Sequence, residues 1–364
     1  MRILIAAGRS GGHIFPALSL ACRLKKRLKG SKIFFIGEKD ELTEKILSRQ
    51  QYPLFTIPIT RLPSRICLEY IKFSKKLGLA IVPIWSILRK TRPDIVIGFG
   101  GAITGPVLLL SSLSRITSII HEQNVIPGRT NRILANFVDR IAISFPESEK
   151  FFNLRKVVLT GNPIRRSILG QDKIAGRKEL GLDKDKFTIL VIGGSQGSSR
   201  LNEIVWRTFS KIDKQGKIDF QLIHITGERD YRKMRQHYQT TTFNSAILPF
   251  YDKMGIVYSA SDLVLTRAGA GTISEITSCG LGSILVPYPY AGSHQSANAQ
   301  ALAERGGAVL IEEREISAGY LRKIFSDLAR NKPRLNKMAK KSKDMGRPHA
   351  DELLADEVMK LMNK

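Results

Sequence analysis

Short apolar runs alternate along the chain with longer amphipathic stretches. RILIAA at residues 2–7 precedes the helix-like PALSLACRLKKRL, and KIFFIG at 32–37 follows it. The runs DIVIGFG, SIIHEQN and RIAISF continue the rhythm through the first half of the chain. Buried strands separated by amphipathic helices are typical of βαβ units. The pattern therefore predicts an α/β protein with a parallel sheet.

The same alternation begins again at Phe187. The stretch FTILVIGGSQGSSRLNEIVW is followed by FQLIHITG, SAILPF, DLVLTRAG and GSILVPYP. Both halves open with an apolar strand, a glycine-rich turn and a helix, the turns being GRSGGH at 8–13 and GGSQGS at 193–198. We therefore predict two Rossmann-like lobes that face each other across a cleft.

The turn Gly161-Asn162-Pro163 separates the two halves, because glycine and proline interrupt regular structure. We place an N-terminal domain at 1–161 and a C-terminal domain at 162–345. The segment 346–364 is predicted to be a helix that packs back on the N-terminal domain.

Composition narrows the class of protein. The chain has 364 residues, 43% of them hydrophobic and 25% charged, which is typical of a soluble globular protein with about two domains. Cys22, Cys67 and Cys279 are too far apart for a zinc site or a disulfide framework, which favours a reducing compartment. MRILIAAG leads directly into a strand pattern without a cleavage site, so we expect no signal peptide and a mature chain that begins at Met1.

The net charge of +26 indicates a polyanionic partner: nucleic acid, anionic lipid or a phosphorylated substrate. Charge alone does not choose among these. A basic nucleic-acid-binding protein remains an alternative from a different class, although the chain has no aromatic RNP pattern, zinc-ligand spacing or helix-turn-helix signal.

Glycine-rich turns between a strand and a helix suit phosphate binding, because backbone N–H groups and the helix N-terminus approach the anion. Neither turn fits the GxGxxG or GxxxxGK[ST] templates, which disfavours dinucleotide and P-loop sites. A single turn of this kind is about as often a connection without a ligand as it is a phosphate site. Two such turns, each at the start of a similar lobe, favour ligand binding. His13 closes the first turn at the sheet edge where a general base or hydrogen-bond donor would act. The alternative is a histidine whose polar atoms are satisfied by local backbone.

Other polar clusters follow the predicted strands. GFGGAITGP at 98–106 and HEQN at 121–124 should emerge at one sheet edge, where a sugar or its acetamide would supply hydrogen-bond partners. In TRAGAGTISE at 266–275, Glu275 could accept from a ribose diol or complement a helix dipole in the first turn. The loop PYPYAGSHQSANA offers further amide and imidazole groups. Asp183-Lys184-Asp185 is interpreted as a solvated turn, and no other metal-ligand spacing occurs.

Seven motifs occur in order between residues 8 and 299: GRSGGH, GFGG, HEQN, GNPIR, GGSQG, TRAGAGTISE and HQ-x-x-NA. Together they closely resemble the MurG family, the bacterial UDP-N-acetylglucosamine:undecaprenyl-pyrophosphoryl-N-acetylmuramoyl-pentapeptide N-acetylglucosaminyltransferases. The resemblance implies a GT-B enzyme that moves N-acetylglucosamine from UDP-GlcNAc to the MurNAc C4 hydroxyl of lipid I, giving lipid II with inversion. It also implies a peripheral protein on the cytoplasmic face of the cell membrane, active in peptidoglycan synthesis and hence in cell shape and division. The nearest enzymatic alternative is a UDP-GlcNAc 2-epimerase, which shares the two lobes and the donor.

The resemblance also implies roles for individual residues. His13 is the candidate base, Ser195 would meet the diphosphate, and Glu275 the ribose hydroxyls. Gln295 would meet the sugar hydroxyls, and Tyr251 would contact uracil through its backbone. No resident metal or cofactor is expected, with assistance from Mg²⁺ left open. The full set of candidate substrate-binding residues is Ser10, Gly11, Gly12 and Asn124 from the first lobe, with Arg165, Ser195, Tyr251, Ala270, Gly271, Thr272, Ile273, Ser274, Glu275 and Gln295 from the second.

Two features concern the acceptor side. Arg9 stands where the family usually has glycine, so it is strained if that position needs a positive φ. Alternatively its guanidinium helps hold the lipid pyrophosphate. The stretch LGLAIVPIWSIL at 77–88 is too short to cross a bilayer as a helix but could touch an anionic membrane. For Leu77, Ile81 and Leu88 individually, burial in the core is the expectation. The basic residues flanking this stretch are Lys72, Lys75, Lys76, Arg89, Lys90 and Arg92.

Overall fold

The computed structural model describes residues 1–59, 68–194, 197–214, 220–289 and 293–363, without the side chains of residues 42, 68–77 and 214. The chain divides into two compact units. The first comprises Met1–Arg165 together with His349–Lys364, and the second comprises Arg166–Pro348. The division thus falls four residues beyond the turn at Gly161, whose φ of +82° suits glycine.

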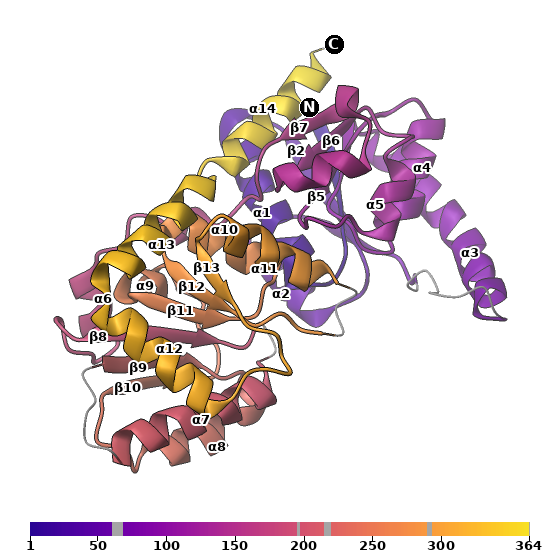
Figure 1. The fold of residues 1–364 in the computed structure, drawn as a ribbon. Coiled ribbons are helices and arrows are strands. Elements are labelled where there is room, and N and C mark those ends of the chain that lie inside the picture. The colour runs from indigo at the N-terminus through magenta and orange to yellow at the C-terminus, as the bar shows by residue number, and fades with distance from the viewer. Residues whose placement is uncertain (60–67, 195–196, 215–219, 290–292, 364) are drawn as a thin grey trace. The chain divides into compact units, whose positions relative to one another are not determined.

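A seven-stranded parallel sheet forms the centre of the first unit, with the order β3-β2-β1-β4-β5-β6-β7 (Figure 1). The direction of strand succession reverses between β1 and β4, which is the switch point where open α/β sheets bind ligands. The prediction of a parallel α/β sheet is confirmed. The strands are β1 (Arg2–Ala7), β2 (Lys32–Gly37), β3 (Leu54–Thr56), β4 (Ile95–Gly98), β5 (Thr117–Glu122), β6 (Arg140–Ile143) and β7 (Val157–Leu159).

Helices cover both faces of this sheet. Ile3 and Ile5 of β1 pack in a core that includes α1 and α14, while Leu4 packs on the opposite face in a core that includes α3, α4 and α5. Successive side chains of a strand point to opposite faces, so a strand buried on both sides is apolar throughout. The helices are α1 (Gly11–Arg27), α2 (Glu41–Arg49), α3 (Leu68–Thr91), α4 (Thr104–Leu113), α5 (Arg129–Leu134) and α14 (Ala350–Met362), with 3₁₀ turns at Pro146–Phe151 and Leu154–Lys156.

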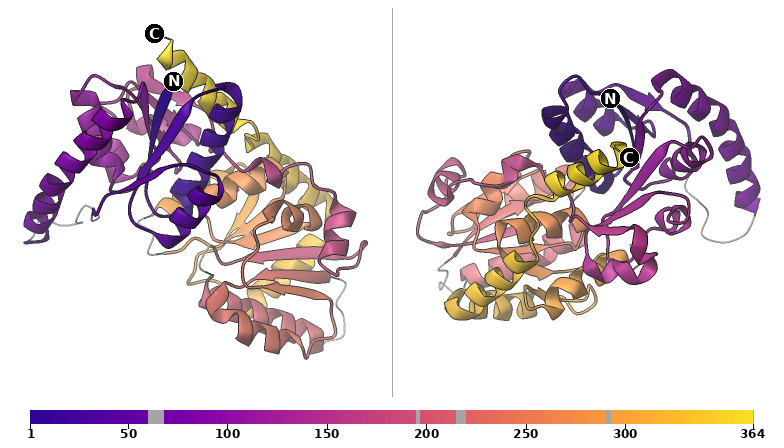
Figure 2. Two further views of the ribbon diagram at one scale, coloured as in Figure 1. Left: turned by 180° about the vertical axis from the view of Figure 1, so that it is seen from behind. Right: turned by 90° about the horizontal axis from the view of Figure 1, so that it is seen from above.

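The last helix, α14, belongs to the first unit and lies alongside α1 (Figure 2). Leu354 and Val358 of α14 are fully buried in the core that α1 shares. The Nε atom of Arg23 lies 2.8 Å from an Asp351 carboxylate oxygen, and Arg27 forms an ion pair with Asp356. Apolar packing and complementary charge therefore join the end of the chain to its beginning.

Helix α3 lies at the margin of the first unit in every view (Figure 1, Figure 2). Leu88 is buried as predicted, but Ile81 is 43% exposed, so its predicted burial is wrong. The outward face is apolar, with Leu79 at 76%, Val82 at 70% and Trp85 at 43% exposure. Leu77, Lys72, Lys75 and Lys76 lie outside the described side chains. No helix in the described part of the chain is both long enough and apolar enough to cross a membrane.

The second unit contains a six-stranded parallel sheet with the order β10-β9-β8-β11-β12-β13. Its succession reverses between β8 and β11, so it repeats the doubly wound plan of the first. The strands are β8 (Phe187–Ile192), β9 (Phe220–Ile225), β10 (Ser245–Leu248), β11 (Leu263–Thr266), β12 (Gly282–Leu285) and β13 (Ala308–Leu310). The helices are α6 (Lys173–Glu179), α7 (Ser199–Lys214), α8 (Glu228–Tyr238), α9 (Met254–Ala260), α10 (Ala270–Cys279), α11 (His294–Glu304), α12 (Ala318–Arg330) and α13 (Lys332–Met345), with a 3₁₀ turn at Arg166–Ile168.

One large hydrophobic cluster holds this unit together. Phe209 of α7 is fully buried, and its ring centroid lies 5.5 Å from that of Phe220 and 5.7 Å from that of Phe325. Leu201 and Val205 occupy the same side of α7, because residues four apart share a helix face. The cluster joins α7, α8, α12 and α13 to one face of the sheet and thereby fixes the strand ends that carry the candidate site.

Candidate active site

The first glycine-rich turn packs directly against the loop after β4. Gly8 N donates to Gly100 O at 3.0 Å, and a Cβ added to Gly101 would lie only 2.6 Å from Gly8 Cα. Gly100 and Gly101 have φ of +89° and +87°, a region that other residues rarely adopt. Glycine is therefore required on both loops, because any side chain would force them apart.

His13 lies against these glycines at the start of α1. A Cβ on Gly8 would come within 2.9 Å of His13 Nδ1, and a Cβ on Gly100 within 3.1 Å of Nε2. Ser10 is the N-cap of α1, and its hydroxyl oxygen lies 2.9 Å from Nδ1. The half-buried imidazole is thus held by a hydroxyl and by glycine backbone at the switch point of the sheet. Gly11 and Gly12 form the first residues of the helix beside it.

The HEQN cluster does not present four side chains to a ligand, which corrects our interpretation of it. His121, Glu122 and Gln123 are at most 3% exposed and are satisfied within the unit. Gln123 Nε2 donates to Phe99 O at 3.1 Å, which ties the loop after β5 to the loop after β4. Asn124 alone is half-buried, at the edge that the prediction gave it.

Glu122 organises the loop that carries Asn124. One carboxylate oxygen accepts from Asn124 N at 2.9 Å and from Asn124 Nδ2 at 3.2 Å. The other accepts from Gly128 N at 3.0 Å and from Asn131 Nδ2 at 2.8 Å. Burial raises the pKa of Glu122 above its ordinary value, and these donated hydrogen bonds oppose the rise. Four donors around one carboxylate fit its ionised form, which has only acceptors.

His121 supports the same loop as a neutral group. Its Nε2–H donates to Gly161 O at 2.9 Å, and Nδ1 lies 3.0 Å from Gln123 Nε2, which can donate to it. Complete burial lowers the pKa of His121 to about 4. His121 is therefore a structural partner of the turn at Gly161 at neutral pH.

Two arginines that the sequence analysis singled out, Arg9 and Arg165, lie in the first unit. Arg9 is absent from the described non-glycine residues with positive φ, so the strain considered for it does not occur. Its Nε lies 3.8 Å from a Glu38 carboxylate oxygen, and its side chain is 56% exposed. Arg165, assigned from sequence to the second lobe, belongs to the first unit, and its guanidinium lies 4.9 Å from the centre of the Phe15 ring.

In the second unit, the TRAGAGTISE motif spans the end of β11 and the start of α10. Ala270, Gly271 and Thr272 form the first turn, whose N–H groups have no acceptor within the helix. Ile273 is 1% exposed and packs in the core, so its side chain cannot reach a ligand. Ser274 donates its hydroxyl to Ala270 O at 2.8 Å. The turn can therefore bind an anion through its backbone N–H groups but not through these side chains.

Glu275 lies in the second turn of α10, and the first turn contains no acidic residue. The alternative that Glu275 complements the helix dipole in the first turn is therefore wrong. One carboxylate oxygen accepts from Tyr258 OH at 2.8 Å. The hydrogen bond from Tyr258 fixes the orientation of the Glu275 carboxylate.

Arg267, which was not among the predicted site residues, joins the loops at this edge. The guanidinium is 7% exposed and forms an ion pair with both oxygens of Glu313, after β13. Its NH2 donates to Ser198 Oγ at 2.7 Å, and NH1 to Val286 O at 3.2 Å. One buried side chain thus connects the loops that follow β8, β11, β12 and β13. The arginine in TRAG is plain in the sequence, but neither its burial nor its partner 46 residues away could be predicted from the sequence.

The remaining candidates belong to neighbouring loops. Gln295, in the first turn of α11, accepts from Tyr288 N at 2.9 Å through its side-chain oxygen. Ser293, the N-cap of this helix, has a φ of +66°, which is strained for serine. Tyr251 donates its hydroxyl hydrogen to Glu179 at 2.9 Å. Burial, and to a lesser extent this hydrogen bond, raise the pKa of Tyr251. Ser195 lies outside the described residues.

No group of three or more His, Cys, Asp or Glu side chains in the described ranges is arranged to hold a metal ion. Asp183 of the DxD sequence accepts from the backbone N–H groups of Asp185 and Lys186, as a turn residue does.

Comparison with known proteins identifies the family of this chain. The glycosyltransferase family 28 N-terminal domain matches residues 3–143, and the family 28 C-terminal domain matches residues 188–354. A protein from Halothermothrix orenii named UDP-N-acetylglucosamine–N-acetylmuramyl-(pentapeptide) pyrophosphoryl-undecaprenol N-acetylglucosamine transferase is 39% identical over 96% of both chains. A protein of the same name from Acetivibrio thermocellus is 37% identical over 100% of this chain and 98% of its own.

Solved structures show the same fold. The crystal structure of Acinetobacter baumannii MurG matches with a TM-score of 0.78 and 28% identity over 99% of both chains. A UDP-GlcNAc 2-epimerase from Neisseria meningitidis, solved with UDP-GlcNAc, matches with a TM-score of 0.71 over 99% of this chain and 100% of its own, but at 15% identity this likeness concerns the fold alone. The predicted GT-B class is confirmed, and the chain belongs to the MurG family of glycosyltransferase family 28.

Proposed function

We propose that this protein transfers N-acetylglucosamine from UDP-GlcNAc to the MurNAc C4 hydroxyl of lipid I, giving lipid II with inversion at the anomeric carbon. The observation that carries the proposal is the 39% identity, over 96% of both chains, to a protein named for this transfer. The two family 28 domain matches support the same class of chemistry. The reaction is a step of peptidoglycan synthesis.

His13 is the proposed general base for the acceptor hydroxyl. When Nδ1–H donates to Ser10 Oγ, the lone pair that a base needs is on Nε2. A side chain at Gly8 or Gly100 would collide with the ring, so glycine at both positions leaves room for this orientation. His13→Ala is expected to lower kcat by about 10² or more while UDP-GlcNAc binding is retained. A kcat within a few-fold of wild type would remove His13 from this role.

Donor binding is proposed for the strand ends of the second unit. Glu275, held by Tyr258, would accept from the ribose hydroxyls, and the first turn of α10 offers N–H groups to the nucleotide. Calorimetry should show that Glu275→Ala weakens UDP-GlcNAc binding more than substitutions at the other candidate positions do. Glu315→Ala, which alters an exposed carboxylate, is the matched control. Equal affinities of the two variants would exclude Glu275 from the site.

The departing UDP gains negative charge as the glycosidic bond breaks, so its diphosphate needs positive partners. We propose the Arg165 guanidinium for the positive charge and Ser195 as a hydrogen-bond donor, with Tyr251 and Gln295 contacting uracil and sugar. We propose that these donors and this charge act without a resident metal. Turnover should therefore persist in a chelator. A loss of turnover that Mg²⁺ restores would contradict this part of the proposal.

The acceptor carries a prenyl chain, so we propose peripheral attachment of the first unit to the cytoplasmic face of an anionic membrane. The apolar outward face of α3, with Leu79, Val82 and Trp85, supports this surface, and Arg89 lies 3.5 Å from the centre of the Trp85 ring. Changing these three apolar residues to serine should reduce flotation with vesicles. Ile84 is unsuitable for this test because it is fully buried.

Leu113→Ser is a suitable control for the α3 variants, since Leu113 is 73% exposed elsewhere in the same unit. Equal flotation of the control and the triple variant would exclude α3 as the contact. The epimerase alternative is separated by product analysis, because an epimerase converts UDP-GlcNAc without any acceptor.

A further inference from the structure

The outward side of α13 and the adjoining part of α12 form a dense cationic surface on the second unit. Six exposed residues define this α12–α13 basic surface: Lys323, Arg330, Lys332, Lys337, Lys340 and Lys341. On the inward side of α13, Leu335 and Met338 are buried against the hydrophobic cluster. The helix is therefore amphipathic in an unusual way, with an outer face that is cationic and not merely polar.

Little negative charge offsets this surface. Residues 318–345 contain nine basic and two acidic side chains, which gives them a net charge of +7. One of the acids, Asp327, is engaged in an ion pair with Arg334. The six residues of the basic surface form no ion pair with any residue in the described part of the chain. A surface of this kind attracts polyanions, and the attraction is screened by salt.

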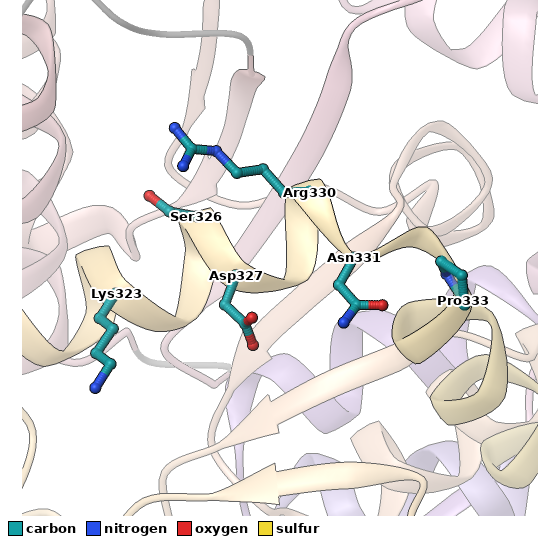
Figure 3. Close-up of a pocket in the computed structure, with 6 residues that line it drawn as sticks. All are labelled: Lys323, Ser326, Asp327, Arg330, Asn331 and Pro333. Atoms are coloured by element: carbon teal, nitrogen blue, oxygen red, sulfur yellow. The ribbon is translucent and has the colours of Figure 1, made fainter.

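A shallow hollow of about 500 Å³ interrupts the surface where α12 ends and α13 begins (Figure 3). Lys323 and Arg330 are among the residues that line it, and Ser326 and Asn331 add polar groups to the lining. Asp327 and Pro333 complete the lining. The Asp327 carboxylate is paired with Arg334, so Lys323 and Arg330 leave the lining of the hollow net positive.

We propose that the α12–α13 basic surface binds anionic phospholipid headgroups and docks the second unit on an anionic membrane. The choice of a lipid surface rests on the proposed function, whose acceptor is membrane-anchored. It also rests on composition: five of the six residues are lysine and one is arginine, and Tyr320 is the single exposed aromatic residue of α12 and α13. Lysine is a point charge that suits diffuse arrays of phosphate. Single-stranded nucleic acid is usually bound with aromatic stacking, and base edges are usually read by forked arginine.

The test uses the full chain and vesicles of phosphatidylcholine with and without phosphatidylglycerol. Lys337, Lys340 and Lys341 are changed together to glutamine on the exposed face of α13. Each basic residue near an anionic surface contributes about 1 kcal/mol, or roughly a fivefold change in partitioning. The triple variant should thus partition onto phosphatidylglycerol vesicles roughly a hundredfold more weakly than wild type at about 0.1 M salt.

Two further variants keep this test decisive. Lys178→Gln, Lys184→Gln and Lys211→Gln remove the same charge from exposed lysines elsewhere in the second unit, and they should leave partitioning within a few-fold of wild type. Changing the three α13 lysines to arginine should preserve binding, which separates charge from damage to the helix. Equal partitioning of the two glutamine triples would overturn the proposal. It would also be overturned if the α13 triple lost RNA binding while vesicle binding was unchanged.

The experiment also separates this proposal from the function on which it rests. Transfer to a water-soluble lipid I analogue should be the same in wild type and in the α13 triple variant. If wild type shows no transfer, the proposed function fails, and the vesicle result still decides the basic surface. If transfer occurs and the α13 triple partitions like its control, the basic surface fails alone.

Discussion

Glu122→Gln is the substitution that tests the architecture of the first unit most sharply. The carboxylate accepts four hydrogen bonds, two from Asn124, one from Gly128 and one from Asn131. A glutamine side chain keeps one acceptor oxygen and replaces the other with an NH₂ group. Whichever way the amide is oriented, it turns donors toward two existing donors.

The magnitude follows from those two lost acceptors. A buried donor left without a partner costs about 1–3 kcal/mol, and removing a buried charge offsets part of the sum. The offset is real here, because burial raises the pKa of Glu122. We expect a net loss of about 2–4 kcal/mol in the free energy of unfolding, or roughly 5–15 °C in Tm for a unit of this size.

Urea unfolding at neutral pH measures the loss, with hydrogen exchange at the Asn124 and Gly128 amides as a local readout. Glu44→Gln is the matched control, since Glu44 is exposed in the first turn of α2, and it should change stability by no more than about 0.5 kcal/mol. If Glu122→Gln were as mild as Glu44→Gln, the carboxylate would not organise the 124–131 loop, and our account of HEQN would be refuted.

Three further predictions concern buried or strained groups. Burial lowers the pKa of His121 to about 4 and that of His224 to about 3. Below about pH 6.5 the unfolded chain therefore binds more protons than the folded protein, and the free energy of unfolding should fall as the pH drops to about 4, by up to about 1.4 kcal/mol per pH unit for each histidine. Urea unfolding measured between pH 7 and 5.5 without such a slope would contradict this prediction. Glu313→Gln should destabilise by about 3–5 kcal/mol because it strands the Arg267 charge, whereas replacing both partners with apolar residues should cost less, as a double-mutant cycle in urea would reveal. Ser293→Gly should raise Tm slightly by relieving the positive φ, and a marked drop in calorimetry would show that the serine side chain stabilises the loop.

Local features of the sequence predicted most of the fold. Strands such as Ile95–Gly98 are apolar throughout because helices cover both faces, and this pattern can be recognised without a structure. The glycine-rich turns at Gly8 and Gly193 follow their strands directly, so their place at a sheet edge could also be predicted. These inferences succeed because strand periodicity and turn chemistry depend on neighbouring residues.

The partners of polar side chains could not be predicted in the same way. Gln123 donates to the Phe99 carbonyl on the loop after a neighbouring strand, and Arg267 pairs with Glu313 from a loop two strands away in the sheet. Such pairs depend on strand order, which sequence periodicity does not contain. The exposure of Ile81 has a related cause, because an apolar helix at the margin of a sheet buries one side only.

The central claim is that this chain joins a UDP-linked sugar to a lipid-linked acceptor. The most direct measurement incubates the protein with radiolabelled UDP-GlcNAc and lipid I, and follows UDP release and label in the lipid product. We predict one UDP released for each N-acetylglucosamine transferred, and no conversion of the donor when the acceptor is omitted. Absence of transfer with both substrates present, or conversion of the sugar without an acceptor, would contradict the account.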